Sequence, residues 1–474
     1  MFDSIHEECG VFGIYEKKRT KVAIPAYFGL YALQHRGQES CGITVCDDGI
    51  FREKRADGLV SEVFTKEETE KLGEGNMAVG HVRYSTTGGK SMNNIQPLVI
   101  RHIKGNMALV HNGNLVNAGT LRRIFEMSAG IFHGSSDTEA IAYAIVRERL
   151  SAASTEEAVE KAMPFLKGAY SCILMTATKL IAFRDPEGFR PLCIGECEDG
   201  AMVVASETCA LEAVGAKFLR NVEAGEIVVI DESGLRSIKT NCSGRKRICI
   251  FEYIYFARPD SVIEGVSVHK ARLHAGQILA KYSPVEADVV IGVPDSGIDA
   301  ALGYARESGI PYGIGFVKNK YIGRSFIQPE QNGRENAVKI KLSPIEETVR
   351  GKRVVMIDDS IVRGTTAGRI VGLLRQAGAK EVHVRISSPP FIHSCYFGTD
   401  IDSEENLIAD KCSSKDEIAS FIGANSLAYL PTEALGDIIN NGFGYCDGCF
   451  TGNYPVDVSE AGNKNKFDEK IHKE

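Results

Sequence analysis

The sequence predicts two successive α/β domains: a layered α+β domain over residues 9–240 and a domain built on a parallel sheet over residues 241–474. In the first half, predicted strands arrive in groups with helices between the groups, which is typical of layered α+β folds. In the second half, strands and helices alternate, which is typical of a parallel sheet. Between them, the polar, turn-rich residues 231–247 predict a linker.

Composition and charge limit the classes of protein to which this chain can belong. A chain of 474 residues has room for two or three domains, and its 43% hydrophobic and 25% charged residues are those of a globular protein. No apolar run approaches the ~20 residues of a membrane helix, and the N-terminus lacks the apolar core of a secretory signal. We therefore expect a cytoplasmic protein with no membrane partner. The net charge of −7 argues against nucleic acid as a partner.

Apolar periodicity places the elements of both halves. In the first half, strands are expected at residues 11–15, 42–45, 77–80, 107–110, 172–175, 180–183 and 202–205, and helices at 25–33, 136–150 and 155–166. In the second half, strands are expected at 288–293, 313–317, 354–357 and 382–386, helices at 269–281 and 298–307 and after residue 364, and a polar loop at 318–336. Ligands of parallel sheets bind at the carboxyl ends of the strands.

One such strand end carries the residues of a phosphate site. The buried strand 354–357 is followed by Asp358 and Asp359, then by Arg-Gly-Thr-Thr at 363–366 and an amphipathic helix. A helix N-terminus offers free N–H groups and positive potential to an anion, and threonines there can cap the helix. Paired carboxylates suit Mg²⁺ and sugar hydroxyls. The alternative is an ordinary turn with a solvated acidic pair.

This combination resembles the motif that binds phosphoribosyl pyrophosphate (PRPP) in type I phosphoribosyltransferases. Residues 294–297, Pro-Asp-Ser-Gly, end another predicted strand, and residues 320–327 match the family's flexible loop. The resemblance implies one Mg²⁺ per subunit, placed by Ser296, Asp358 and Asp359. The PRPP-binding residues that it implies are Asp295, Ser296, Lys320, Arg324, Asp358, Asp359, Arg363, Gly364, Thr365 and Thr366.

Four short motifs in the first half are individually ordinary. They occupy residues 7–14, 80–86, 111–115 and 135–139. Taken alone, Asn-Gly at 112–113 is most simply interpreted as a hairpin turn, and Ser-Asp-Thr-Glu at 136–139 as a helix cap. Together with residues 33–40, the set resembles the class II glutamine amidotransferase domain, which has the αββα fold of N-terminal-nucleophile (Ntn) hydrolases.

That resemblance assigns a role to each motif. Cys9 would be the nucleophile, with its own α-amino group, of reference pKa ~7.7–8.0, as the base. Residues 1–8 would then be a propeptide whose removal frees that amine. The Asn112 side chain and the Gly113 N–H would bind the oxyanion. Arg83 would bind the glutamine carboxylate and Asp137 its ammonium group.

Four of the thirteen cysteines form a candidate metal site. Cys446 and Cys449 form a CxxC pair, which alone is a weak signal. Cys249 and Cys395 lie in the same half in contexts that resemble the family's, whereas Cys412 lies there too but matches no motif. Four thiolates suit zinc or a [4Fe–4S] cluster equally well, and free thiols are the alternative. Similarity to the cluster-bearing branch of the amidophosphoribosyltransferases, which also has the propeptide, favours one [4Fe–4S] cluster per subunit. We expect it to be structural, because neither reaction needs an electron.

Over almost its full length the chain resembles the amidophosphoribosyltransferase family. The resemblance implies transfer of the glutamine amide nitrogen to PRPP in the first committed step of purine biosynthesis, through an ammonia channel formed when the loop 318–336 closes. It also implies a homotetramer inhibited by purine nucleotides. One rival is the glutamine-dependent sugar isomerase that makes glucosamine 6-phosphate, which shares only the first half. The other is a regulatory protein that binds PRPP or nucleotides without catalysis.

Overall fold

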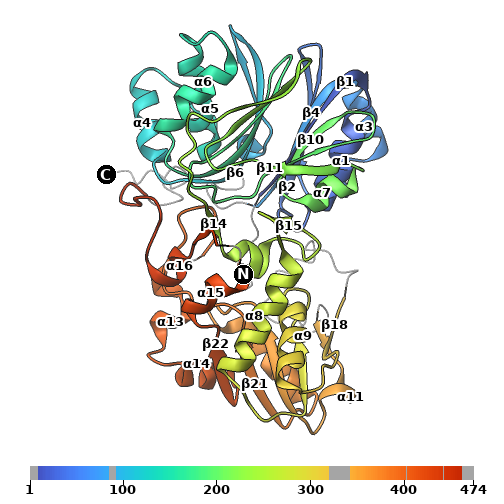
Figure 1. The fold of residues 1–474 in the computed structure, drawn as a ribbon, viewed down its shortest axis with the longest axis vertical. Coiled ribbons are helices and arrows are strands. Elements are labelled where there is room, and N and C mark those ends of the chain that lie inside the picture. The colour runs from blue at the N-terminus through green and yellow to red at the C-terminus, as the bar shows by residue number, and fades with distance from the viewer. Residues whose placement is uncertain (1–8, 85–91, 320–341, 402, 441, 462–474) are drawn as a thin grey trace, which may run out of the picture.

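The computed structural model describes residues 9–84, 92–319, 342–401, 403–440 and 442–461. Figure 1 shows two parts stacked along the long axis of the molecule. The upper part contains the first half of the chain, and the lower part contains the second half. β14 (Arg247–Cys249) lies where the chain passes from one to the other.

Two antiparallel sheets face each other in the upper part. The seven-stranded sheet has the order β11 (Lys217–Asn221), β9 (Cys193–Glu196), β10 (Met202–Ala205), β1 (Gly10–Thr20), β4 (Gly75–Arg83), β2 (Ser40–Asp47) and β3 (Ile50–Asp57). The six-stranded sheet has the order β13 (Gly234–Ile238), β12 (Ile227–Asp231), β8 (Leu180–Arg184), β7 (Gly168–Met175), β6 (Gly105–Leu115) and β5 (Leu98–His102).

Strand β1 shows why these sheets are buried on both faces. Alternate residues of a strand point to opposite sides. Val11 joins the core between the two sheets, whereas Phe12 and Ile14 join the core beneath helix α1 (Ala23–Ala32). Helices cover the six-stranded sheet in the same way, chiefly α5 (Asp137–Arg149). The layers are therefore helix, sheet, sheet and helix, as predicted.

The predicted linker at 231–247 is wrong in part. Residues 234–238 form β13, which pairs with β12 along its full length. β13 is the last strand at one edge of its sheet, and its three central residues are exposed. Its polar sequence therefore does not carry the apolar pattern from which a strand is predicted.

The lower part is built on a parallel sheet of order β17 (Val289–Gly292), β20 (Arg353–Asp358), β21 (Glu381–Ile386) and β22 (Ser426–Tyr429). α8 (Val268–Tyr282) and α9 (Gly297–Ser308) pack against one face, and α12 (Thr365–Gln376) and α14 (Lys415–Ile422) pack against the other. The predicted strand 313–317 is wrong in part. Residues 311–313 form a parallel bridge to Val290 of β17. β18 (Phe316–Lys318) instead pairs antiparallel with β19 (Leu342–Pro344) in a separate ribbon.

The C-terminal segment returns to the seam between the two parts. β23 (Gly444–Cys446) pairs parallel with β14. The shorter elements are α2 (Val60–Val63), α3 (Lys66–Leu72), α4 (Ala118–Met127), α6 (Thr155–Ala162), α7 (Thr208–Ala213), η3 (Glu252–Phe256), β15 (Val262–Ile263), β16 (Val266–Ser267), α11 (Glu346–Val349), α13 (Ile408–Lys411), α15 (Leu435–Ile439) and α16 (Gly448–Thr451). Within the described ranges, no helix has the length and apolar character needed to cross a membrane.

Candidate active sites

Cys9 lies at the end of the seven-stranded sheet. It directly precedes β1, whose Gly10 pairs with Val82 of β4 in antiparallel register. The next position along β4 is Arg83, which is buried, so the sheet places Cys9 beside Arg83. The Cys9 thiol lies 3.6 Å from the carbonyl oxygen of Tyr84 and donates to it. The predicted nucleophile and the predicted carboxylate-binding arginine are thus neighbours.

Asn112 and Gly113 come from the facing sheet, inside β6 rather than at a turn. The hairpin interpretation of Asn-Gly is therefore wrong. Gly113 has a φ of +133°, and a Cβ there would lie 2.2 Å from the Ala169 carbonyl oxygen, so only glycine fits. The Asn112 amide nitrogen is buried and has no hydrogen-bond partner among the described residues. A buried donor without a partner is costly, and an oxyanion would satisfy it.

A buried histidine connects the two sheet ends. The Nε2–H of His81, on β4, donates to the carbonyl oxygen of His111, on β6, over 3.0 Å. Burial lowers the pKa of His81 to about 3, so its ring is neutral at physiological pH. Arg83 lies two residues after His81 on β4, and Asn112 lies one residue after His111 on β6. This bond therefore places the two predicted binding groups at the same end of the two sheets.

Asp137 is the first residue of α5, and Ser136 is the helix cap. The capping interpretation is therefore confirmed, and Asp137, the predicted binding residue, directly follows the cap. One Asp137 oxygen accepts from the Leu115 N–H at 2.9 Å, and the other lies 3.5 Å from His111 Nδ1. Burial alone would raise the pKa of Asp137, but His111 and these hydrogen bonds lower it. An ionised carboxylate here suits an ammonium ligand.

The second site lies at the carboxyl ends of β17 and β20. The Val293 N–H donates to the Ile357 carbonyl at 2.9 Å, which aligns the two strand ends. The Ser296 hydroxyl then donates to Asp359 at 2.6 Å, although 63 residues separate them in the chain. Lys318 pairs with the carboxylate of Asp295. The structure thus brings together Ser296 and Asp359, as predicted.

Asp358 ends β20 and is adjacent to Asp359. Burial, followed by the charge of Asp359, raises the pKa of Asp358 well above the ordinary value for a carboxyl group. Two carboxylates held this close repel each other, and a divalent cation between them would relieve the repulsion. Together with the Ser296 hydroxyl they make an oxygen-rich set that fits Mg²⁺, which commonly binds one or two carboxylates and the phosphates of a substrate.

Helix α12 begins directly beyond this acidic pair. Its N-cap is Gly364, with a φ of +85°, and Thr365 and Thr366 are its first two residues. The expectation that a threonine caps this helix is therefore wrong. A Cβ at Gly364 would lie 2.3 Å from the Ile408 side chain. Glycine here lets the turn place the helix N-terminus, with its free N–H groups, towards an anion.

The four candidate ligand cysteines, Cys249, Cys395, Cys446 and Cys449, are all buried and share one core cluster. Cys249 and Cys446 are paired across β14 and β23, and the Cys449 carbonyl accepts from the N–H groups of residues 392 and 393, close to Cys395. Burial raises the pKa of Cys449, and the three other thiols raise it further, so all four lie within electrostatic range. Over the described ranges, however, no three His, Cys, Asp or Glu side chains form a set that could hold a single metal ion.

Some predicted residues lie outside the described part of the chain. These are the propeptide at residues 1–8 and, in the loop, Lys320 and Arg324. Conversely, sequence analysis missed the partners of Arg36, whose Nε–H donates to the Cys9 carbonyl at 3.1 Å. Arg36 belonged to the motif at 33–40, but no sequence signal pointed to its carboxylate partners, Glu207 and Glu252.

Comparison with known proteins identifies both halves. A family described as "Glutamine amidotransferase domain" matches residues 81–213, and one described as "Phosphoribosyl transferase domain" matches residues 268–387. The amidophosphoribosyltransferase of Bacillus subtilis is 49% identical over 460 residues, which cover 96% of this chain and 95% of that protein. The chain belongs to the amidophosphoribosyltransferase family.

Two solved structures share the whole fold. One is described as the allosteric regulatory enzyme of purine biosynthesis. It is 49% identical in sequence, the match covers 95% of this chain and 97% of that protein, and the TM-score is 0.89. The other is the B. subtilis glutamine PRPP amidotransferase complexed with ADP and GMP, at 48% identity, 95% and 98% coverage and a TM-score of 0.88. The predicted fold class is therefore confirmed.

Family membership also confirms the predicted enzyme class. The chain is an amidophosphoribosyltransferase that transfers the amide nitrogen of glutamine to PRPP in purine biosynthesis. The sugar-isomerase rival is excluded, because residues 268–387 match a phosphoribosyltransferase domain. The alternative hypothesis of a non-catalytic regulatory protein is not supported, since an enzyme of this class matches almost the full chain.

Proposed function

We propose that the two half-reactions are divided between the two strand-end sites, with glutamine hydrolysed at Cys9 and PRPP aminated at Asp358 and Asp359. The observation that carries the first assignment is the buried Asn112 amide nitrogen, which has no partner among the described residues and lies at the same end of the sheets as Cys9. An oxyanion formed on the glutamine amide is the acceptor that this donor lacks.

In the glutamine half-reaction, the Cys9 sulfur attacks the amide carbon while its α-amino group takes the thiol proton. The amide oxygen carries the negative charge between the Asn112 side chain and the Gly113 N–H. Collapse releases ammonia and leaves a thioester, which water hydrolyses to glutamate. Arg83 and the ionised Asp137 hold the glutamine carboxylate and ammonium groups. The amine can act only after residues 1–8 are removed, so mass spectrometry of active enzyme should show Cys9 as its first residue.

In the second half-reaction, the nitrogen lone pair of ammonia attacks C1 of PRPP, and pyrophosphate leaves with the bonding pair. The N-terminus of α12 and residues 363–366 bind the 5′-phosphate, and the loop at 294–297 holds the pyrophosphate. Ser296, Asp358 and Asp359 would hold Mg²⁺, which neutralises negative charge on the leaving pyrophosphate. Lys320 and Arg324 would lie near the same group.

Cys249, Cys395, Cys446 and Cys449 would hold one structural [4Fe–4S] cluster per subunit. Four thiolates suit zinc or a cluster equally well on ligand chemistry, and the resemblance to the cluster-bearing branch of the family is what supports the cluster. It would join the start of the second half to the C-terminal segment.

Regulation by nucleotides is supported by the relatives. The B. subtilis structure is described as a complex with ADP and GMP, and another structure is described as an allosteric regulatory enzyme. We propose inhibition by purine nucleotides on this basis, and a homotetrameric state and a cytoplasmic location on the resemblance to the family.

The division of labour is tested by assaying pyrophosphate release from PRPP with either glutamine or ammonium as the nitrogen source. Cys9→Ala should abolish the reaction with glutamine and retain the reaction with ammonium. Asp358→Asn with Asp359→Asn should abolish both reactions but retain glutaminase activity. If Cys9→Ala abolished both reactions, the two sites would not be separable as proposed.

A further inference from the structure

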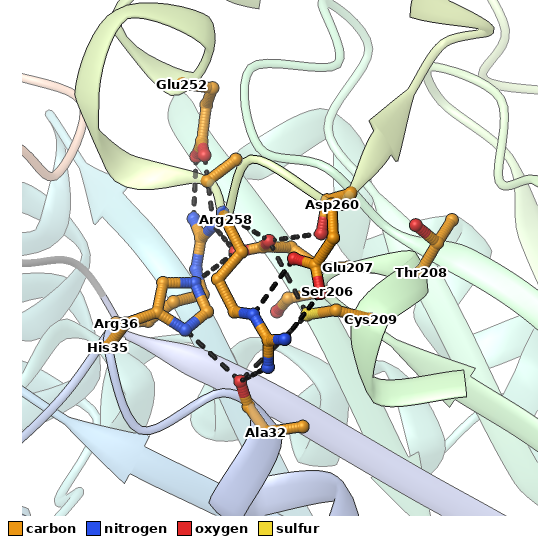
Figure 2. A network of polar contacts seen from close by, with 12 residues as sticks. Ala32, His35, Arg36, Ser206, Glu207, Thr208, Cys209, Glu252, Arg258 and Asp260 are labelled. Carbon is orange, nitrogen blue, oxygen red and sulfur yellow. Dashed lines mark hydrogen bonds and ion pairs between the residues drawn. The ribbon is translucent and has the colours of Figure 1, made fainter. Parts of the chain in front are cut away.

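A buried ion cluster lies where the two halves of the chain meet. Arg36 and Arg190 come from the first half, Glu252 comes from the second, and all three side chains have 0% exposure. Glu207 completes the cluster and is equally buried. Figure 2 shows Glu252 pointing towards Arg36 from the segment above it. Two arginines and two glutamates balance in charge, which a site without water requires.

The guanidinium of Arg36 makes hydrogen bonds on all of its edges. Its two terminal nitrogens donate to the two Glu252 oxygens at 3.0 and 2.7 Å, and one of them also donates to Glu207. The remaining Nε–H donates to the Cys9 carbonyl oxygen at 3.1 Å. Because the guanidinium is planar and rigid, the bidentate grip of Glu252 also fixes where the Nε–H points.

Glu252 is itself held by the phosphoribosyltransferase half. It is the first residue of the π-helical turn η3, and the carbonyls of Tyr253 and Tyr255 in this turn, and of Ala257 directly after it, accept from the buried Arg272 at 2.8–2.9 Å. Arg272 lies on α8, which packs against α9, and α9 begins directly after Ser296. The position of Glu252 therefore depends on the domain that binds PRPP.

We propose that Glu252 is a positioning residue for the glutamine half-reaction, acting through Arg36 to place the Cys9 backbone. The carbonyl, amine and thiol of Cys9 share one residue, so holding the carbonyl limits where the amine and thiol can lie. The inference rests on the proposed role of Cys9 as nucleophile. It assigns Glu252, a residue of the phosphoribosyltransferase half, a function in the glutamine reaction of the other half.

The simpler alternative is that the cluster only holds the two halves together. The chain offers a matched control, because a second buried pair also joins the halves: Arg184 donates to Glu264, with side chains 2% and 4% exposed. The other bonds of Arg184 go to the carbonyls of Val222 and Gly188, away from Cys9. A purely structural role would make the two pairs equivalent.

The test compares Glu252→Gln with Glu264→Gln in the full-length enzyme, with Cys9→Ala in parallel. Each variant is assayed for glutamine hydrolysis over a range of pH and for PRPP amination with ammonium. A displacement of about 1 Å in a reacting group can cost on the order of 100-fold in rate. We therefore expect Glu252→Gln to lower kcat for glutamine by about 10- to 100-fold. KM for glutamine should stay nearly unchanged, because Arg83 and Asp137 are intact, and ammonium-dependent activity should be retained.

Glu264→Gln should retain both reactions. Equal effects of the two substitutions on glutamine hydrolysis, or an unchanged kcat in Glu252→Gln, would overturn the inference while Cys9→Ala still abolished glutamine use. Retained glutamine use in Cys9→Ala would instead overturn the proposed function. If Glu252→Gln lost both reactions, Arg36→Lys would decide: selective loss of glutamine use supports the inference, and loss of both reactions refutes it.

Discussion

Replacing Asn112 with alanine tests the oxyanion site, because the structure predicts a large loss of activity with little change in stability. The Asn112 amide nitrogen is buried without a partner among the described residues, so its removal breaks no hydrogen bond at that atom. Loss of one oxyanion donor typically lowers kcat by ~10²–10³-fold, or ~2.7–4 kcal/mol of transition-state stabilisation. We expect that loss in glutamine-dependent activity, with ammonium-dependent activity and the thermal unfolding midpoint nearly unchanged.

Asn117 provides the control. It is buried too, but its amide donates to the Phe165 carbonyl at 2.9 Å and its oxygen accepts from the Lys167 N–H at 3.1 Å. Asn117→Ala should therefore cost on the order of 1–3 kcal/mol of stability, with little effect on kcat. Circular dichroism suits the unfolding measurement, because the chain contains no tryptophan. A fall in kcat of less than tenfold in Asn112→Ala would refute the assignment.

Three further predictions concern other parts of the molecule. Gly364 has a φ of +85° and lies against Ile408, so Gly364→Ala should destabilise the conformation of the phosphate-binding turn by ~1–2 kcal/mol. KM for PRPP should then rise by about 5- to 30-fold. Glutamine hydrolysis should be unchanged, which serves as the control. The pKa of Asp137 is lowered in the folded protein, so its ionised carboxylate stabilises the fold above the unfolded pKa of ~3.9, and this stabilisation is lost as pH falls through the folded pKa. Asp137→Asn should therefore make the free energy of unfolding depend less on pH in the acid range. An unchanged pH dependence there would contradict the assignment. Anaerobically purified protein should contain about four iron and four sulfide per chain, whereas zinc without iron would exclude the cluster.

Local motifs made much of the site predictable. Asp358 and Asp359 end an apolar strand, and the helix that follows starts at Thr365, so the phosphate site is contained in one short stretch. Burial on both faces leaves a continuous apolar run in the sequence, from which β1 and β20 are predicted. The equally buried β12 carries such a run too and is nevertheless absent from the predicted strands.

Several of the missed features depend on distant contacts or on exposed edges. Glu252 lies 216 residues from Arg36 in the chain, and a single glutamate in an aromatic stretch gives no sign that it binds a buried arginine. β13 was interpreted as a linker because an edge strand with exposed residues needs no apolar pattern. Residues 316–318 are extended, as expected, but they pair in a two-stranded ribbon outside the main sheet.

The central claim is that ammonia formed at Cys9 is used at Asp358 and Asp359 of the same chain. It is tested most directly by supplying glutamine labelled with ¹⁵N at the amide together with excess unlabelled ammonium, and measuring the isotope in phosphoribosylamine by mass spectrometry after chemical trapping. The account predicts that the product keeps the ¹⁵N label of glutamine despite the unlabelled pool. A product whose label is diluted to the isotope ratio of the bulk ammonium would contradict it.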